Sequence, residues 1–93
     1  MNPEPDMFRR TPLMLAIRNH HNDIFFNLFF QSNKYYKRDY SYNTFLHYAA
    51  AYGNMEIIKY LLELKMQQTM NRKSFYPFEI AVLKGHFQCA RLL

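Results

Sequence analysis

Short amphipathic segments alternate with polar connectors along the chain, and their spacing predicts pairs of helices. Apolar residues recur three and four positions apart over residues 55–64, which places them on one face of a helix. The preceding run, 46–52, fits a shorter helix whose N-cap is Thr44. Gly53 is suited to end that first helix, and Asn54 is suited to cap the second. The central part of the chain therefore predicts two helices joined by a tight turn.

The same arrangement occurs three times. Thr44 follows Thr11 by 33 residues, and Tyr76 follows Thr44 by 32. In the first block Thr11 is the predicted N-cap, Pro12 suits the first helical position, and His20 takes the place of the glycine at the helix break. Small and apolar residues recur at matching positions: Ala16, Ala49 and Ala81, and three residues earlier Leu13, Leu46 and Phe78. A period of this length indicates stacked repeats, because one such unit cannot bury its apolar face alone.

Composition narrows the class of protein. The 93 residues are enough for one domain, and 49% hydrophobic with 18% aromatic residues argues against disorder. A single cysteine excludes an internal disulfide, so we expect an intracellular, cytoplasmic protein, with the nucleus as the other compartment. The longest apolar stretch, 24–30, is far shorter than the roughly 20 residues that span a bilayer. We therefore expect no membrane insertion.

Candidate chemistry is sparse. No nucleophile, P-loop or dinucleotide-binding motif occurs, so the sequence predicts neither an enzyme nor a small-molecule substrate or cofactor. His86 and Cys89 stand three residues apart, which is half of a zinc set, but no further ligands join them in the repeat arrangement. Cys89 is better explained as a small buried apolar residue. We expect no metal site.

The net charge of +5 is spread over all three blocks. Basic and aromatic residues alternate in 34–42, a composition that also occurs in single-strand nucleic-acid binding. Placement of this segment in a connector between repeats, where its aromatic rings pack and its charges are solvated, is favoured, because single-strand sites normally need an extended stacking platform. Nucleic-acid binding stays as the alternative hypothesis.

The blocks resemble the ankyrin repeat. Residues 11–16 read T-P-L-M-L-A, residues 44–49 read T-F-L-H-Y-A, and the glycine-histidine pair at 85–86 precedes an apolar helix. The resemblance implies an all-α solenoid of stacked helix-turn-helix units with short β-hairpin-like connectors. It covers the chain as a single domain, with approximate repeats 8–40, 41–72 and 73–93.

The sequence departs from the family pattern at three places. Tyr76 replaces the capping threonine, which predicts a loss of about 0.5–2 kcal/mol if no other group substitutes. Lys65 and Met66 stand where a glycine is usual, so we expect the connector 65–75 to be irregular. The third repeat ends within its second helix. We therefore expect either that these 93 residues are a piece of a longer array or that a partner covers this end.

The resemblance implies a scaffold or adaptor that binds another protein, and the positive charge favours an acidic segment of that partner. A regulatory arm of a larger enzyme or channel is a compatible role. The family's contact positions, carried over to this sequence, nominate Arg9, Arg10, Pro12, Tyr40, Tyr42, Asn43, Phe45, Tyr52, Ser74, Phe75 and Lys84.

Overall fold

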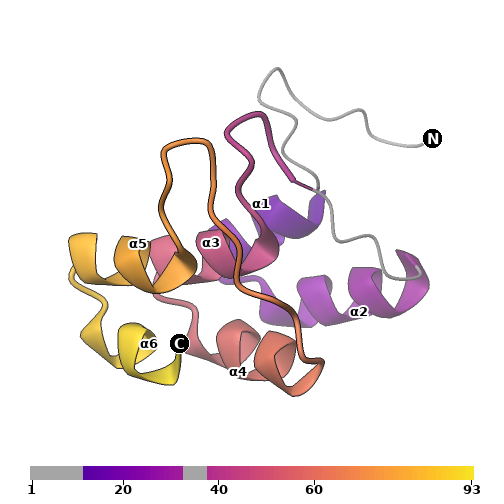
Figure 1. Ribbon diagram of the computed structural model, residues 1–93. Coiled ribbons are helices and arrows are strands. Elements are labelled where there is room, and N and C mark those ends of the chain that lie inside the picture. Colours follow the sequence, from indigo (N-terminus) through magenta and orange to yellow (C-terminus); the bar gives the residue numbers. More distant parts are fainter. Residues whose placement is uncertain (1–11, 33–37) are drawn as a thin grey trace.

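The computed structural model describes residues 12–32 and 38–93, which form six helices in two rows (Figure 1). The helices are α1 (Pro12–Arg18), α2 (Asn22–Ser32), α3 (Phe45–Ala51), α4 (Met55–Glu63), α5 (Pro77–Leu83) and α6 (Phe87–Leu92). One row contains α1, α3 and α5, and the other contains α2, α4 and α6. The described part of the chain has no strand, so the predicted all-α solenoid is confirmed.

Neighbouring repeats contact each other through both rows. Helix α3 packs against α1 on one side and α5 on the other, and α4 packs against α6. Two loops stand beside the first row: the first hairpin (residues 38–44) and the second hairpin (residues 69–75) (Figure 1). None of the described helices is long and apolar enough to cross a membrane.

Helix starts and breaks follow the local sequence. The Thr44 side chain accepts a hydrogen bond from the His47 backbone at 3.4 Å, and the Asn54 side chain accepts one from Ile57 at the same distance. Gly53 and His20 adopt φ values of +69° and +57° at the two helix breaks. The predicted caps and turns in these two repeats are confirmed, while the predicted cap Thr11 lies outside the described residues.

The core runs between the rows. The recurring alanines Ala16, Ala49 and Ala81 are all buried, which lets adjacent helical layers approach closely. Aromatic rings fill the space between the first two repeats: Phe25 and Phe45 meet edge to face with centroids 5.9 Å apart. Such edge-to-face pairs contribute about 0.5–1.5 kcal/mol beyond the area they bury.

The two ends of the stack differ from its middle. Phe78 and Ile24 are 44% and 48% exposed, although their counterparts Leu46 and Ile57 are fully buried. Matching positions in the sequence therefore do not have matching burial: Leu46 lies between two neighbouring repeats, whereas among the described residues Phe78 has a neighbouring repeat on one side only.

The departures from the family pattern are accommodated locally. The Tyr76 side chain caps nothing, but the Glu79 side chain accepts a hydrogen bond from the Tyr76 backbone at 2.9 Å and satisfies one free N–H at this end. Lys65 adopts φ +61°, the conformation for which glycine is usual. The connector 65–75 contains no helix or strand, as its sequence predicts.

Candidate partner-binding groove

A groove of about 400 Å³ lies where the hairpins meet the first-row helices. Its floor comes from residues one helical turn apart on α3 and α5: Tyr48, Ala51 and Tyr52, followed by Ile80, Leu83 and Lys84. Its wall comes from the hairpins, through Ser41, Asn43, Asn71, Lys73 and Phe75, and His47 of α3 also contributes. We call this cleft the hairpin groove.

The two hairpins have the same backbone design. In the first, the Asp39 N–H donates to the Asn43 carbonyl at 3.2 Å; in the second, the Asn71 N–H donates to the Phe75 carbonyl at 3.0 Å. Tyr42 and Ser74, 32 residues apart, both adopt φ +66°. Neither residue is glycine, so each turn holds a conformation that costs about 1–2 kcal/mol and that the surrounding bonds must sustain.

Hydrogen bonds between the hairpins join them into one wall. The Arg72 N–H donates to the Ser41 carbonyl at 2.8 Å, and the Arg72 Nε donates to the Tyr40 carbonyl at 2.6 Å. The Asn71 amide donates to the Asn43 side-chain oxygen at 2.8 Å. A partner that contacts one hairpin therefore meets a surface whose shape depends on both.

Asp39 fixes the first hairpin to the helix behind it. Its carboxylate accepts from the Tyr48 hydroxyl at 2.7 Å, from the Asn43 backbone at 2.8 Å and from the Asn43 amide at 3.1 Å. The side chain is only 8% exposed. These bonds direct the negative charge inward, away from the groove surface.

His47 holds the base of the second hairpin. Its Nδ1 accepts from the Thr44 backbone at 3.0 Å, which leaves Nε2 to donate to the Phe75 carbonyl at 2.8 Å. Burial lowers the pKa of His47; the Phe75 carbonyl and Asp39 oppose this shift, while Arg38 adds to it. The neutral ring is therefore the form that the fold selects.

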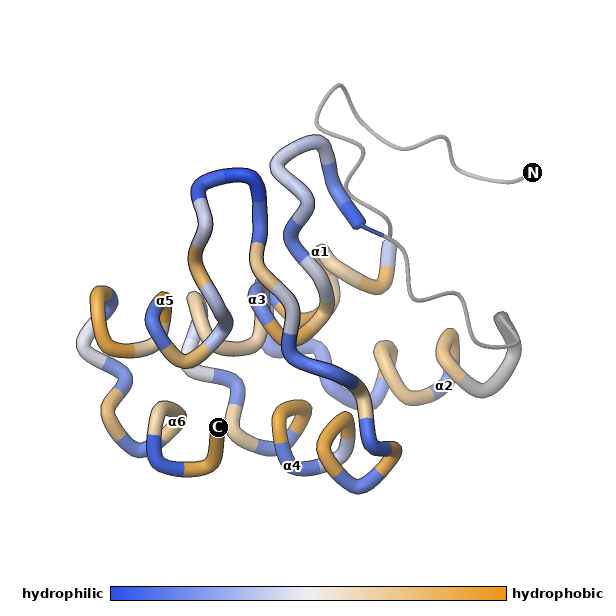
Figure 2. The backbone as a smooth tube through the Cα atoms, viewed as in Figure 1, coloured by the Kyte–Doolittle hydropathy of each residue, from blue (hydrophilic) through white to orange (hydrophobic). Residues whose placement is uncertain are grey.

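Two guanidinium groups lie over the ring of Tyr42. The Arg38 and Arg72 carbons are 4.1 Å and 5.3 Å from the ring centroid. Arg38 also donates to the Thr69 hydroxyl at 2.9 Å. Figure 2 shows the tip of the second hairpin as a continuous hydrophilic stretch. The exposed edge of the wall thus combines positive charge with an aromatic ring.

The groove itself is positively charged and partly apolar. Lys73 and Lys84 line it, and none of its lining residues is a carboxylate. Phe75, Ile80 and Leu83 supply apolar surface between the two lysines along the chain. This combination suits a segment that carries both acidic and apolar side chains.

The structure places the predicted contact residues in four groups. Asn43, Tyr52, Phe75 and Lys84 line the groove. Tyr40, Tyr42 and Ser74 are exposed on the hairpins, and Pro12 is exposed on α1. Arg9 and Arg10 lie outside the described residues.

Phe45 alone makes up the fourth group, and its nomination as a contact residue is wrong. Its side chain is 1% exposed and packs against the Phe25 and Phe29 rings. Phe45 follows the N-cap of α3 where the family pattern has proline, and the extra ring turns into the core between repeats. The position is conspicuous in the sequence, but the side chain is structural.

Sequence reasoning nominated four of the twelve groove residues and missed the other eight, including Ser41 and Lys73 of the hairpins and Ile80 and Leu83 of α5. The signal that would have found the two helical ones is the register of the repeats. Ile80 and Leu83 stand 32 residues after Tyr48 and Ala51, so all four share one helical face. Lys73 lies in the turn of the second hairpin. Its place in the groove wall depends on the pairing of the two hairpins, which the sequence does not show.

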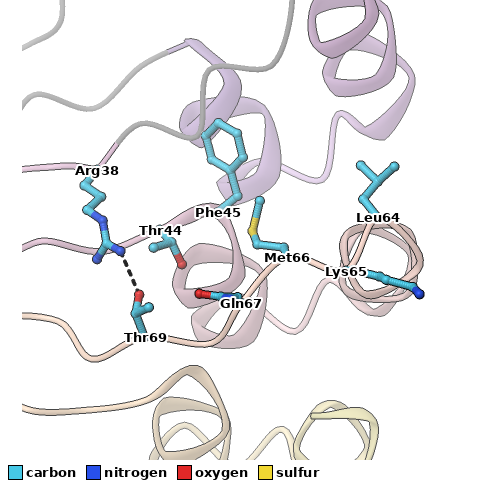
Figure 3. A pocket seen from close by; sticks show the side chains of 8 residues that line it. All are labelled: Arg38, Thr44, Phe45, Leu64, Lys65, Met66, Gln67 and Thr69. Carbon is cyan, nitrogen blue, oxygen red and sulfur yellow. Dashed lines mark hydrogen bonds between the residues drawn. The ribbon is translucent and has the colours of Figure 1, made fainter.

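A second pocket lies at the base of the hairpins, on the side of the connector that follows α4 (Figure 3). It measures about 360 Å³ and includes Arg38, Thr44, Lys65 and Thr69 among its lining residues. Most of its polar groups are used internally, because Arg38 bonds Thr69 and Thr44 bonds His47. We therefore interpret it as a packing gap between repeats.

Within residues 12–32 and 38–93, no group of three or more His, Cys, Asp or Glu side chains is placed to hold a metal ion. Cys89 is 2% exposed, and burial raises the pKa of its thiol. A buried thiol of this kind is a poor nucleophile.

Comparison with known proteins agrees with the repeat architecture. The family model described as ankyrin repeats in three copies matches residues 13–93. No curated protein gives a significant match.

Proposed function

Because the chain belongs to the ankyrin repeat family, whose members are generally protein–protein interaction modules, we propose that it binds an extended segment of another protein in the hairpin groove. The family is typically non-catalytic, and we propose the same for this chain. The observation that carries the proposal is the groove's composition: apolar residues of α5 and the second hairpin lie beside two lysines, with no carboxylate in the lining.

Charge favours an acidic partner segment. Lys84 stands at the end of α5, and Lys73 projects from the second hairpin, so the groove offers a cation from each side. The nearby Asp39 is occupied by three hydrogen bonds and does not neutralise them at the surface. Such complementarity contributes to association rate and specificity more than to raw affinity.

Tyr52 is the best candidate for an anchor. Its side chain is 38% exposed at the end of α3, the Arg18 guanidinium lies 5.9 Å from its ring centroid, and its ring stacks on Tyr48. Tyrosine and arginine are enriched among residues that dominate binding energy, because they combine large contact area with polar groups. Partner side chains would meet a ring already held in place.

The test is selection of peptides from a random 12-residue phage library, followed by fluorescence anisotropy with the selected peptides. We expect those peptides to combine Asp or Glu with apolar residues. Affinity should fall about tenfold or more for Tyr52→Ala and for Lys84→Glu. Lys59→Glu, a change of the same charge on the exposed side of α4, is the control.

Equal affinity of all three variants would overturn the proposed groove. A single-stranded RNA of mixed sequence belongs in the same assay, since it tests the alternative function. Tighter binding to RNA than to any peptide, with a steep loss at higher salt, would favour a nucleic-acid module instead.

We propose an intracellular, cytoplasmic location. Ankyrin repeats are commonly intracellular, and the single cysteine of the chain is a buried free thiol. A role as the regulatory arm of a larger enzyme or channel is compatible with the same groove, because the binding surface would be unchanged.

A further inference from the structure

The two hairpins carry a cluster of cations that the groove alone does not explain. We define the tip cluster as Arg38, Tyr42, Arg72 and Lys73. Its two guanidinium groups lie over one aromatic ring, and Lys73 follows Arg72 in the turn of the second hairpin. Among the described residues, no carboxylate forms an ion pair with any of these three cations, and the groups that accept hydrogen bonds from the two guanidinium groups are neutral.

The neutral partners orient the guanidinium groups without neutralising them. Arg72 bonds the Tyr40 carbonyl through Nε, at 2.6 Å, which leaves both of its terminal amino groups for a ligand. Arg38 is held from two sides, by the Thr69 hydroxyl at 2.9 Å and by the Tyr42 carbonyl at 3.4 Å. Each guanidinium is thereby held in place by neutral partners, and a planar guanidinium suits an anion with several oxygens.

The nearest carboxylate in the sequence is withdrawn from the surface. Asp39, next to Arg38 in the chain, is 8% exposed and accepts hydrogen bonds from Tyr48 and Asn43. The three cations together with Asp39 leave a local charge close to +2. A phosphorylated side chain carries about −1.5 to −2 at neutral pH, so it matches this charge better than a single carboxylate does.

We propose that the tip cluster binds the phosphoryl group of a phosphorylated residue in the partner segment. This inference rests on the proposed function, because the rest of the segment would lie in the hairpin groove. The two arginines lie over the Tyr42 ring and Lys73 follows Arg72 in the turn, while Phe75, Ile80 and Leu83 give the adjoining groove apolar surface. A peptide with one phosphorylated residue beside apolar residues fits that layout, whereas a nucleic acid needs cations repeated along a track.

The experiment is a titration monitored by ¹H–¹⁵N NMR, using N-acetyl-phosphoserine amide as the probe. The Nε–H signals of Arg38 and Arg72 should shift saturably, together with backbone signals of the two turns. N-acetyl-glutamate amide should bind at least fivefold more weakly, because it carries one charge and two oxygens. Equal affinity for the two probes would overturn the phosphoryl assignment.

Variants separate a built site from general attraction to a basic protein. Arg72→Gln and Lys73→Gln should each weaken phosphoserine binding about tenfold. Arg72→Lys keeps the charge but loses the planar fork, and it should weaken binding as well. Lys59→Gln, which removes the same charge from α4, should leave affinity unchanged; an equal loss in this control would overturn the proposal.

One variant and two additional ligands separate loss of the phosphoryl site from loss of the fold or of the groove. Lys73→Gln tests the site without touching the Arg72–Tyr40 bond, so a fold disturbed by loss of Arg72 does not decide the outcome. The phage-selected peptides serve as the second readout: if they bind normally but phosphoserine shifts no tip signal, the phosphoryl site is wrong and the groove stands. If an RNA oligonucleotide shifts the tip signals at lower concentration than phosphoserine-containing versions of those peptides, the protein-partner assignment is wrong.

Discussion

The imidazole Nε2 of His47 donates a hydrogen bond to the carbonyl oxygen of Phe75 over 2.8 Å, so a side chain of the second repeat holds the hairpin of the third. The ring is 1% exposed, and its Nδ1 accepts from the Thr44 backbone. Protonation of Nδ1 would turn this acceptor into a donor, which would then face the Thr44 N–H, itself a donor. The link between the repeats therefore depends on a neutral ring.

This dependence predicts that the protein loses stability in mild acid. Because burial lowers the pKa of His47 below its ordinary value of 6.5, the unfolded chain takes up this proton before the folded chain does. The contribution of His47 to the free energy of unfolding is complete above pH 6.5. It declines as the pH falls from 6.5 through the folded pKa.

Urea unfolding followed by circular dichroism at several pH values between 7.5 and 5 measures this decline. His47→Gln should be less stable than the wild type at pH 7.5, and its stability should depend less on pH over the same range. Parallel curves for the two proteins would show that another group causes the acid sensitivity.

The two glycines should respond differently to alanine. Both have positive φ, so each substitution costs about 1 kcal/mol or more through backbone strain. A Cβ on Gly53 would also lie 2.8 Å from the His86 ring, whereas one on Gly85 would meet nothing within 4 Å. Gly53→Ala should therefore lower the melting temperature more than Gly85→Ala.

A His86→Ala background provides the control for the glycine pair. Removal of the ring removes the contact, so the two alanine substitutions should then have similar costs. A persistent difference in that background would mean that the His86 ring is not its source.

Asn54 should be among the most sensitive polar positions. Its side chain caps α4 through Ile57, and its amide donates to the Ile17 carbonyl at 3.2 Å in the preceding repeat. Asn54→Ala loses the cap and leaves buried groups without partners, which predicts a loss of about 2–4 kcal/mol in unfolding free energy. Asn27→Ala, at an exposed position of α2, should change stability by less than about 0.5 kcal/mol.

Equivalent apolar positions in the second and third repeats should differ in cost. Leu46 is fully buried between α3 and its neighbours, so Leu46→Ala should cost about 2–5 kcal/mol. Phe78 is 44% exposed, and Phe78→Ala should cost about 1 kcal/mol. Chemical denaturation at two protein concentrations measures both; a large cost for Phe78→Ala that grows with concentration would reveal self-association through this end.

The sequence predicted those parts of the fold that local chemistry determines. The structure confirms Gly53 at positive φ and the caps Thr44 and Asn54, which depend on neighbours within a few residues. It also confirms the 33-residue period, which is visible directly in the recurring residue types. The family pattern also nominated Tyr52 and Lys84 as partner-contact residues, and the structure places both in the lining of the groove.

The remainder depends on contacts between repeats. Nothing near Phe45 in the sequence shows that Phe25 and Phe29 of the first repeat will cover its ring. Likewise, Arg72 and Tyr42 are thirty residues apart, and only the pairing of the hairpins brings the guanidinium over the ring. A single sequence provides the register of each repeat but not the partner of each side chain across the layer.

The position of α3 between two neighbours has a consequence for local unfolding. Helix α3 is packed on both sides, by α1 and by α5, whereas α5 and α6 carry exposed apolar residues at their open side. In a stack held by nearest-neighbour interfaces, a unit packed on one side opens at lower free energy than a unit packed on both sides. Backbone amides of α5 and α6 should therefore exchange with deuterium sooner than those of α3, and a ligand that spans both hairpins would slow that exchange by closing the last repeat onto the one before it.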